Sequence, residues 1–223
     1  MDDLLSEKEQ LEQMRAWWSE YGRYVIAGVV IAIVSLVGIN RYNSSKLETQ
    51  VAASGLYETL AEYVSTGDLD KAESVADDLA NDYADTTYAA QSKLAMARLY
   101  MDKNRDEDAA DVLRELLELS GNEELKHVGR LRLARILLYQ DKPQDVLDLL
   151  AQQDAAAFNA LNAELMGDAY LALGRVAEAG DAYRRALADS SQVPTIDRAL
   201  VQMKLADLPV AVSELGEEAG AAE

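Results

Sequence analysis

The chain has 223 residues, of which 40 are Asp or Glu, 21 are Lys or Arg, one is His and none is Cys, giving a formal net charge of −19 at pH 7. This composition excludes cysteine nucleophiles, thiolate zinc sites and multi-histidine metal sites, and its negative field disfavours nucleic acid as a partner. With three Pro, 12 Gly and abundant Ala and Leu, the chain is predicted to be all-α.

Residues 1–23 form an acidic N-terminal segment. Leu11, Met14, Trp18 and Tyr21 share one face of a predicted amphipathic helix, which favours a position on the cytoplasmic membrane surface. A secretory signal peptide begins with a short basic region, whereas six acidic residues come first here. We therefore expect this segment to be retained in the mature protein.

Residues 24–40 carry no formal charge and lie between Arg23 and Arg41. As a helix they would extend roughly 26 Å, slightly less than the hydrocarbon thickness of a bilayer. Aromatic residues flank the run on both sides, as is typical of membrane interfaces: Trp17, Trp18, Tyr21, Tyr24 and Tyr42. The pattern predicts a single transmembrane helix, and a buried core helix is the alternative.

Two further features of the span bear on its surroundings. Gly28, Ala32 and Ser35 form a stripe of small residues that could pack on another membrane helix, although lipid contact alone explains such a stripe equally well. Three Lys or Arg residues lie close before the span and two lie close after it. This small excess favours a cytoplasmic N-terminus. Residues 41–209 are then expected in the periplasm, and the lack of cysteine is compatible with that compartment.

The clearest internal repeat covers residues 160–193. Seven residues follow the spacing of a tetratricopeptide hairpin: Gly167, Tyr170, Gly174, Ala179, Tyr183, Ala186 and Leu187. Ala163 departs from the pattern, because a large residue is usual at that position. Steps of 33 and 37 residues towards the N-terminus place Ala134 and then Ala97 at the position of Gly167, with turns predicted at residues 141–144 and 103–104.

The ends of the repeat array are also marked in the sequence. A first hairpin beginning near Ser54 and Tyr57 is predicted to turn at residues 66–68, and its first helix could continue from the membrane span. Residues 196–208 are predicted to form a capping helix that ends at Pro209, and residues 210–223 an acidic, disordered tail. The predicted fold is a TPR-like helical-hairpin solenoid, and a plain helical bundle is the alternative.

No motif in the chain points to catalysis or to a cofactor. His127 is interpreted as a structural or solvated residue, and no pair of carboxylates is singled out by its spacing. The repeat phase instead predicts an apolar protein-binding groove on the first helices of the hairpins. Its residues are Leu94, Arg98, Met101, Leu131, Arg135, Leu138, Tyr139, Leu161 and Leu171. The alternative is that the terminal helix or the first long helix fills this groove.

Several segments together resemble the YfgM family, in their order more than in any one motif. They are WWSEYGRY before the span, RYNSSK after it, the repeats SKLAMARLYMDKN and RLRLARILL, the hairpin GDAYLALGRVAEAGDAYRRAL and the closing VQMKLADL. The resemblance implies an ancillary subunit of the SecYEG translocon in the bacterial inner membrane, with a periplasmic tetratricopeptide-like domain. It also implies contact with a membrane-anchored periplasmic peptidyl-prolyl isomerase chaperone, and no residue-level site carries over.

Two hypotheses of different classes follow from these observations. The first is a non-enzymatic scaffold at the secretion channel that binds chaperones or nascent secretory proteins through its groove. The second is a regulator of envelope stress signalling whose cytoplasmic segment sequesters a response regulator. Deleting residues 2–20 separates them, because only the regulator would lose its output.

Overall fold

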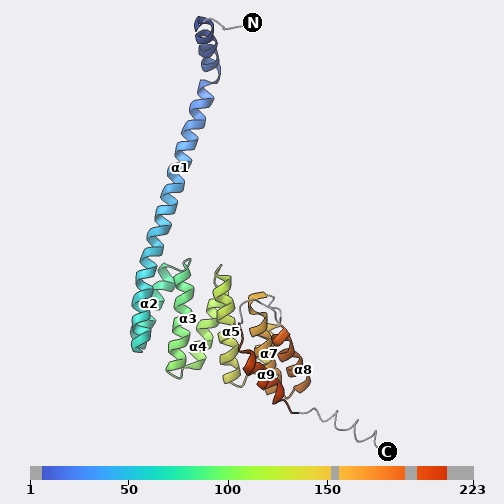
Figure 1. Cartoon of the computed structure of the whole chain (residues 1–223). Coiled ribbons are helices and arrows are strands. Elements are labelled where there is room, and N and C mark those ends of the chain that lie inside the picture. The colour runs from blue at the N-terminus through green and yellow to red at the C-terminus, as the bar shows by residue number, and fades with distance from the viewer. Residues whose placement is uncertain (1–6, 152–155, 189–194, 210–223) are drawn as a thin grey trace, which may run out of the picture. The chain divides into compact units, whose positions relative to one another are not determined.

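The structure is a computed structural model that describes residues 7–151, 156–188 and 195–209. These residues form helices and one 3₁₀ turn, and no strand occurs among them, which confirms the all-α prediction. The elements are α1 (Glu7–Thr66), α2 (Leu69–Asp82), α3 (Thr87–Asp102), α4 (Asp106–Glu118), α5 (Glu123–Tyr139), α6 (Pro143–Leu150), η1 (Ala156–Phe158), α7 (Asn159–Ala172), α8 (Val176–Ala188) and α9 (Arg198–Ala206) (Figure 1). The chain divides into two units, unit 1 (residues 1–52) and unit 2 (residues 53–223).

Unit 1 contains the greater part of α1. Its apolar window has a mean hydropathy of 2.1 over 18 residues, and only 6% of that window is buried. Large apolar side chains such as Ile31, Val34 and Leu36 are exposed around the helix. A helix that is apolar on all sides needs an apolar environment, and unit 1 does not supply one. The observation excludes a core helix buried inside this unit and fits a membrane anchor.

The described residues of unit 2 include four helical hairpins that close with the same turn. In each, a backbone amide donates to the carbonyl oxygen five residues earlier: Asp68 to Tyr63, Arg105 to Tyr100, Lys142 to Leu137 and Arg175 to Tyr170, over 2.8–3.0 Å. The residue before each donor has a positive φ: Gly67, Asn104, Asp141 and Gly174. This is a Schellman turn, which favours Gly and tolerates Asn or Asp.

The turns confirm the predicted repeat phase and correct one boundary. Their acceptor residues, Tyr63, Tyr100, Leu137 and Tyr170, lie 37, 37 and 33 residues apart, and the last two intervals match the steps inferred from sequence. The predicted third turn included Pro143 and Gln144, which instead begin α6. Pro is favoured at the first helical position, where its missing N–H costs nothing.

Each hairpin is closed by packing at equivalent positions in its second helix. Ala72, Ala109, Val146 and Ala179 are all fully buried, one in each repeat. In the fourth repeat, a Cβ on Gly167 would collide with the ring of Tyr183, so only glycine allows α7 and α8 to approach this closely. The alternating helices therefore form a repeat solenoid rather than a plain bundle.

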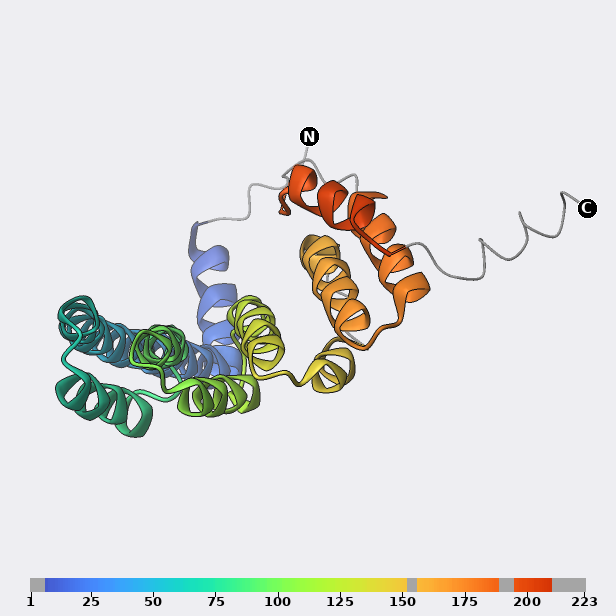
Figure 2. The ribbon, with the colours of Figure 1, turned by 90° about the horizontal axis from the view of Figure 1, so that it is seen from below.

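The predicted capping helix is α9, which packs against α8 at the C-terminal end of the solenoid (Figure 2). Val201 is fully buried and joins a core cluster with Ala179, Tyr183 and Ala186. Asp197 caps the helix by accepting a hydrogen bond from the amide of Leu200 at 3.1 Å. The predicted acidic tail, residues 210–223, lies outside the described residues.

Candidate protein-binding groove

The first helices α3, α5 and α7 line the inner side of the curved stack, and the second helices α4, α6 and α8 line its outer side (Figure 2). The sequence placed nine candidate binding residues on this inner side. Leu94 and Leu131 belong to the main core cluster and are only 8% and 5% exposed. They fill the seam between neighbouring first helices, because these helices pack directly on one another as well as on their second helices.

The remaining candidates are more accessible. Met101, Leu138 and Leu161 are half-buried against the same core cluster. Tyr139 and Leu171 are 72% and 38% exposed, on α5 and α7. The predicted apolar strip is thus reduced to separate apolar side chains on the inner face.

A defined hollow, which we call the α3–α5 hollow, lies between these two helices and has a volume of about 270 Å³. Its lining residues are Ala97, Arg98, Met101, Leu113, Arg132, Arg135 and Ile136. The hollow brings together three of the predicted residues, Arg98, Met101 and Arg135. It adds Arg132, which sequence reasoning missed although it lies one helical turn before Arg135.

The arginines of the hollow retain most of their hydrogen-bonding capacity. Arg132 donates from Nη1 to the carbonyl oxygen of Leu94 at 3.1 Å. Arg98 lies 3.8 Å from the carboxylate of Asp102, an exposed pair on one helix. Arg135 has no ion pair or side-chain hydrogen bond within the described part of the chain.

The terminal helix does not occupy the hollow. Every lining residue comes from α3, α4 or α5, whereas α9 packs against α8. The C-terminal part of α1 joins a separate core cluster with α2 and α3, through Ala53 and Leu60. Neither of the fillers considered from sequence contributes a lining residue.

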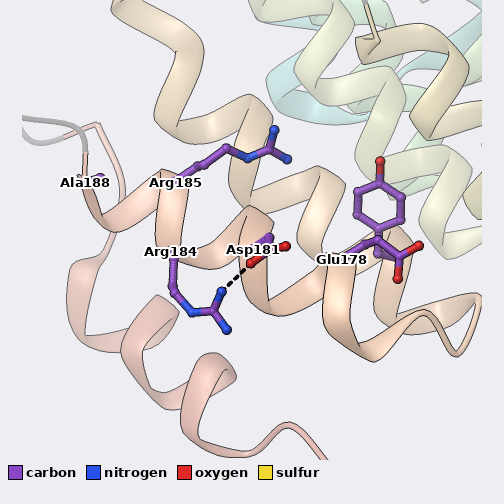
Figure 3. Close-up of a pocket in the computed structure, with 6 residues that line it drawn as sticks. Glu178, Asp181, Arg184, Arg185 and Ala188 are labelled. Atoms are coloured by element: carbon purple, nitrogen blue, oxygen red, sulfur yellow. Dashed lines mark hydrogen bonds and ion pairs between the residues drawn. The ribbon is translucent and has the colours of Figure 1, made fainter. Parts of the chain in front are cut away.

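A larger hollow lies on α8, the outer side of the fourth repeat, where Arg184 pairs with Asp181 of the same helix (Figure 3). Glu178 also faces it, and hydrogen bonds from its own backbone amide and from Arg175 lower the pKa of its carboxyl. Two carboxylates, Glu178 and Asp181, and two guanidinium groups, Arg184 and Arg185, line it, so its charges sum to zero. This hollow therefore has less reason to select a charged partner than the α3–α5 hollow has.

Two of the titratable groups with a shifted pKa, Tyr183 and Lys204, lie where the capping helix meets α7 and α8. Burial, followed by the hydrogen bond that its hydroxyl donates to Asp168 at 2.7 Å, raises the pKa of Tyr183. Burial lowers the pKa of Lys204, but hydrogen bonds to Asp168 and Glu164, at 2.8 and 2.9 Å, outweigh it and raise the pKa overall. These groups tie α7, α8 and α9 together and do not face an open site.

Two other sequence interpretations concern residues away from the hollow. The ring of His127 stacks on Phe158 with centroids 5.1 Å apart, and its Nδ1 lies 3.1 Å from Nη1 of Arg130, as a packing residue would. Gly28, Ala32 and Ser35 are exposed on α1, and nothing lies within 4 Å of a Cβ built on Gly28. Within the described residues, no group of three or more His, Asp or Glu is arranged to hold a metal ion.

Comparison with known proteins agrees with this architecture. A relative from Escherichia coli strain K12, named ancillary SecYEG translocon subunit, is 29% identical over 208 residues, covering 92% of this chain and 98% of the relative. A Neisseria gonorrhoeae protein with the same name is 27% identical over 205 residues, with the same coverage of both chains. These relatives confirm the resemblance to the YfgM family.

Solved structures show the same fold without implying a shared function. A crystal structure of a putative kinesin light chain from Podosopora anserina, with nearly identical TPR-like repeats, superposes with a TM-score of 0.52. Its sequence identity is 20%, and the match covers 69% of this chain and 82% of that one. The family model of the tetratricopeptide repeat-like domain matches residues 15–210. The chain therefore belongs to the tetratricopeptide repeat-like domain family.

Proposed function

We propose that this chain is a membrane-anchored, non-enzymatic scaffold that associates with the SecYEG translocon. The observation that carries the proposal is the match to ancillary SecYEG translocon subunits over 92% of this chain and 98% of the E. coli relative. Such coverage includes the apolar helix as well as the repeats. A repeat solenoid with an inner face suited to protein contacts supports the same role.

The two units would have different roles, membrane anchoring in unit 1 and partner binding in unit 2. Unit 1 would cross the bacterial inner membrane once, with a cytoplasmic N-terminus, and Gly28, Ala32 and Ser35 would pack on a neighbouring membrane helix. Unit 2 would lie in the periplasm and use its inner face to bind a membrane-anchored peptidyl-prolyl isomerase chaperone or secretory chains as they emerge. The exposed residues Tyr139 and Leu171 and the α3–α5 hollow are the parts of that face open to a partner.

Site-specific photo-crosslinking in intact cells tests this proposal. A photoreactive amino acid at Val30, which is exposed in unit 1, should capture a translocon channel subunit. The same group at Tyr139 should capture periplasmic proteins; this position is preferable to Leu138, which is half-buried against the core. Capture of cytoplasmic proteins from Tyr139, or of no translocon subunit from Val30, would contradict the proposal.

A variant lacking residues 2–20 separates the scaffold from the regulatory alternative. The scaffold should keep its crosslinks from Val30 and Tyr139, because both positions lie outside the deleted segment. Loss of an envelope stress response with unchanged crosslinks would instead support a cytoplasmic regulatory role.

A further inference from the structure

We propose that the α3–α5 hollow binds an acidic peptide segment in which an apolar side chain lies beside a carboxylate. The inference rests on the proposed scaffold function and specifies the chemistry of its partner. It combines two properties of the hollow, an apolar floor and a rim of arginines.

The floor of the hollow is apolar and small. Ala97, Leu113 and Ile136 are buried beneath it, and Met101 stands half-buried beside it. A volume of about 270 Å³ falls below the roughly 300–1,000 Å³ of sites that enclose a drug-sized ligand. It suits one or two apolar side chains of a peptide, and the flexible thioether of Met101 can adapt to their shape.

The rim of the hollow is cationic and comes from two helices. Arg98 lies on α3, and Arg132 and Arg135 lie on α5. A guanidinium offers five donors in a planar fork that matches a carboxylate. Only one donor of Arg132 is used at 3.1 Å, and Arg135 is unpaired among the described residues. Most of the rim is therefore available to a ligand.

The rim contrasts with several other cations of the same repeats, although Lys103 and Arg130 also form no ion pair among the described residues. Each of four basic residues around it has an acidic partner within 3.1 Å: Lys93, Arg105, Arg114 and Lys142. In a chain with 40 acidic and 21 basic residues, acidic partners are plentiful. Three guanidinium groups that gather around one hollow with most of their donors free thus favour an anion from outside the chain.

The surroundings favour a peptide carboxylate over a phosphate group. Phosphate sites commonly use free backbone amides at a helix N-terminus. The lining residues here lie in the C-terminal halves of α3, α4 and α5, far from the helix N-termini, and the amides are bonded within the helices. Side-chain guanidinium groups above an apolar floor instead suit an acidic residue next to a leucine-like side chain.

Fluorescence anisotropy with the full-length protein in detergent tests the ligand chemistry. The probe is a fluorescein-labelled nonapeptide, GSGELEGSG, and its controls are GSGQLQGSG, without charge, and GSGEAEGSG, without the large apolar side chain. We expect either control to bind about tenfold more weakly, as the loss of one good contact would produce. Equal binding of either control, or equally strong displacement of the probe by inorganic phosphate and by unlabelled GSGELEGSG, would overturn the proposal.

Charge-reversal variants test the location. The double variant Arg98→Glu/Arg135→Glu should lose at least tenfold in probe affinity, because each glutamate repels the ligand carboxylates. The double variant Arg114→Glu/Arg184→Glu changes the net charge equally at paired residues away from the hollow and should bind normally. Equal losses of probe affinity in the two double variants would show an effect of net charge and would refute the location of the binding site in the hollow. Circular dichroism of both variants reports whether the helices persist, and Arg135→Gln provides a milder substitution.

Two further experiments identify what binds in the α3–α5 hollow. If the probe binds only after residues 210–223 are removed, the site belongs to the chain's own tail, and the proposal of an external partner is overturned. Co-purification with SecYEG separates this inference from the proposed function. Wild-type protein that binds the probe but does not co-purify would refute the scaffold role alone, and co-purification without probe binding would refute the peptide site alone.

Discussion

In the second and third repeats, Arg98 and Arg135 occupy the position just after the small residue of the first helix, and both line the α3–α5 hollow. The fourth repeat has Asp168 at that position, and its carboxylate accepts hydrogen bonds from Tyr183 and from Lys204 of the capping helix. At this repeat position, the end of the solenoid thus pairs its charged group internally, whereas the middle leaves its arginines open. The same repeat position can either stabilise the fold or serve a partner, depending on whether another helix covers it.

The largest effect should come from Tyr183, which is fully buried against Gly167. Tyr183→Ala should lower the free energy of unfolding by about 3–5 kcal/mol, because it leaves a cavity the size of an aromatic ring. Urea unfolding monitored by circular dichroism measures this loss, and hydrogen exchange should show it concentrated in α7–α9. Tyr183→Phe is the matched control, since it removes only the hydroxyl. An Ala variant as stable as the Phe variant would show that ring packing does not hold the cap.

Lys204 should have the next largest effect, because its removal leaves Glu164 and Asp168 together beneath α9 without a cation. All three side chains are at most 25% exposed, so Lys204→Met should cost about 2 kcal/mol. Lys71→Met is the control, because it breaks an exposed pair with Asp68 and should leave the thermal midpoint unchanged. Similar losses in both variants would refute the view that the end of the solenoid depends on internal pairing.

The sequence predicted the hairpins better than it predicted which residues are open. Gly67 and Gly174 mark turns by themselves, because a positive φ favours glycine. Leu94 and Leu131 were expected on the inner face, yet they fill the seam between α3 and α5. First helices contact neighbours on more than one side, so hydrophobic periodicity does not distinguish a seam from an open face. The hydrogen bond from Lys204 to Asp168 joins residues 36 positions apart, so no local sequence pattern predicts it.

Alkaline pH should weaken both the middle and the end of unit 2. Burial, followed by a hydrogen bond to Glu73, raises the pKa of Tyr100 to about 12, and burial with Asp168 also raises that of Tyr183. Unfolded tyrosine titrates near pH 10. Because folding favours the protonated phenols, their contribution is complete below about pH 10 and is lost as pH rises towards 12. Urea midpoints measured from about pH 9 to pH 11 should fall, and less steeply in Tyr100→Phe and Tyr183→Phe. If the urea midpoint falls equally steeply with pH in both variants and in the wild type, the loss of stability comes from other titrating groups.

The smallest effects should come from the four Schellman turns, which differ between the middle and the ends of the array. Asn104 and Asp141 have φ values of 58° and 59° in the two middle turns, where Gly67 and Gly174 serve in the outer ones. Asn104→Gly should stabilise unit 2 by about 0.5 kcal/mol, because relief of the left-handed backbone slightly exceeds the added entropy of the unfolded chain. Gly174→Ala should destabilise it by about 1 kcal/mol for the opposite reason, although nothing lies within 4 Å of a Cβ there. Thermal midpoints of the two variants should therefore shift in opposite directions. A downward shift in both would mean that the side chain of Asn104, rather than its backbone conformation, governs the middle turn.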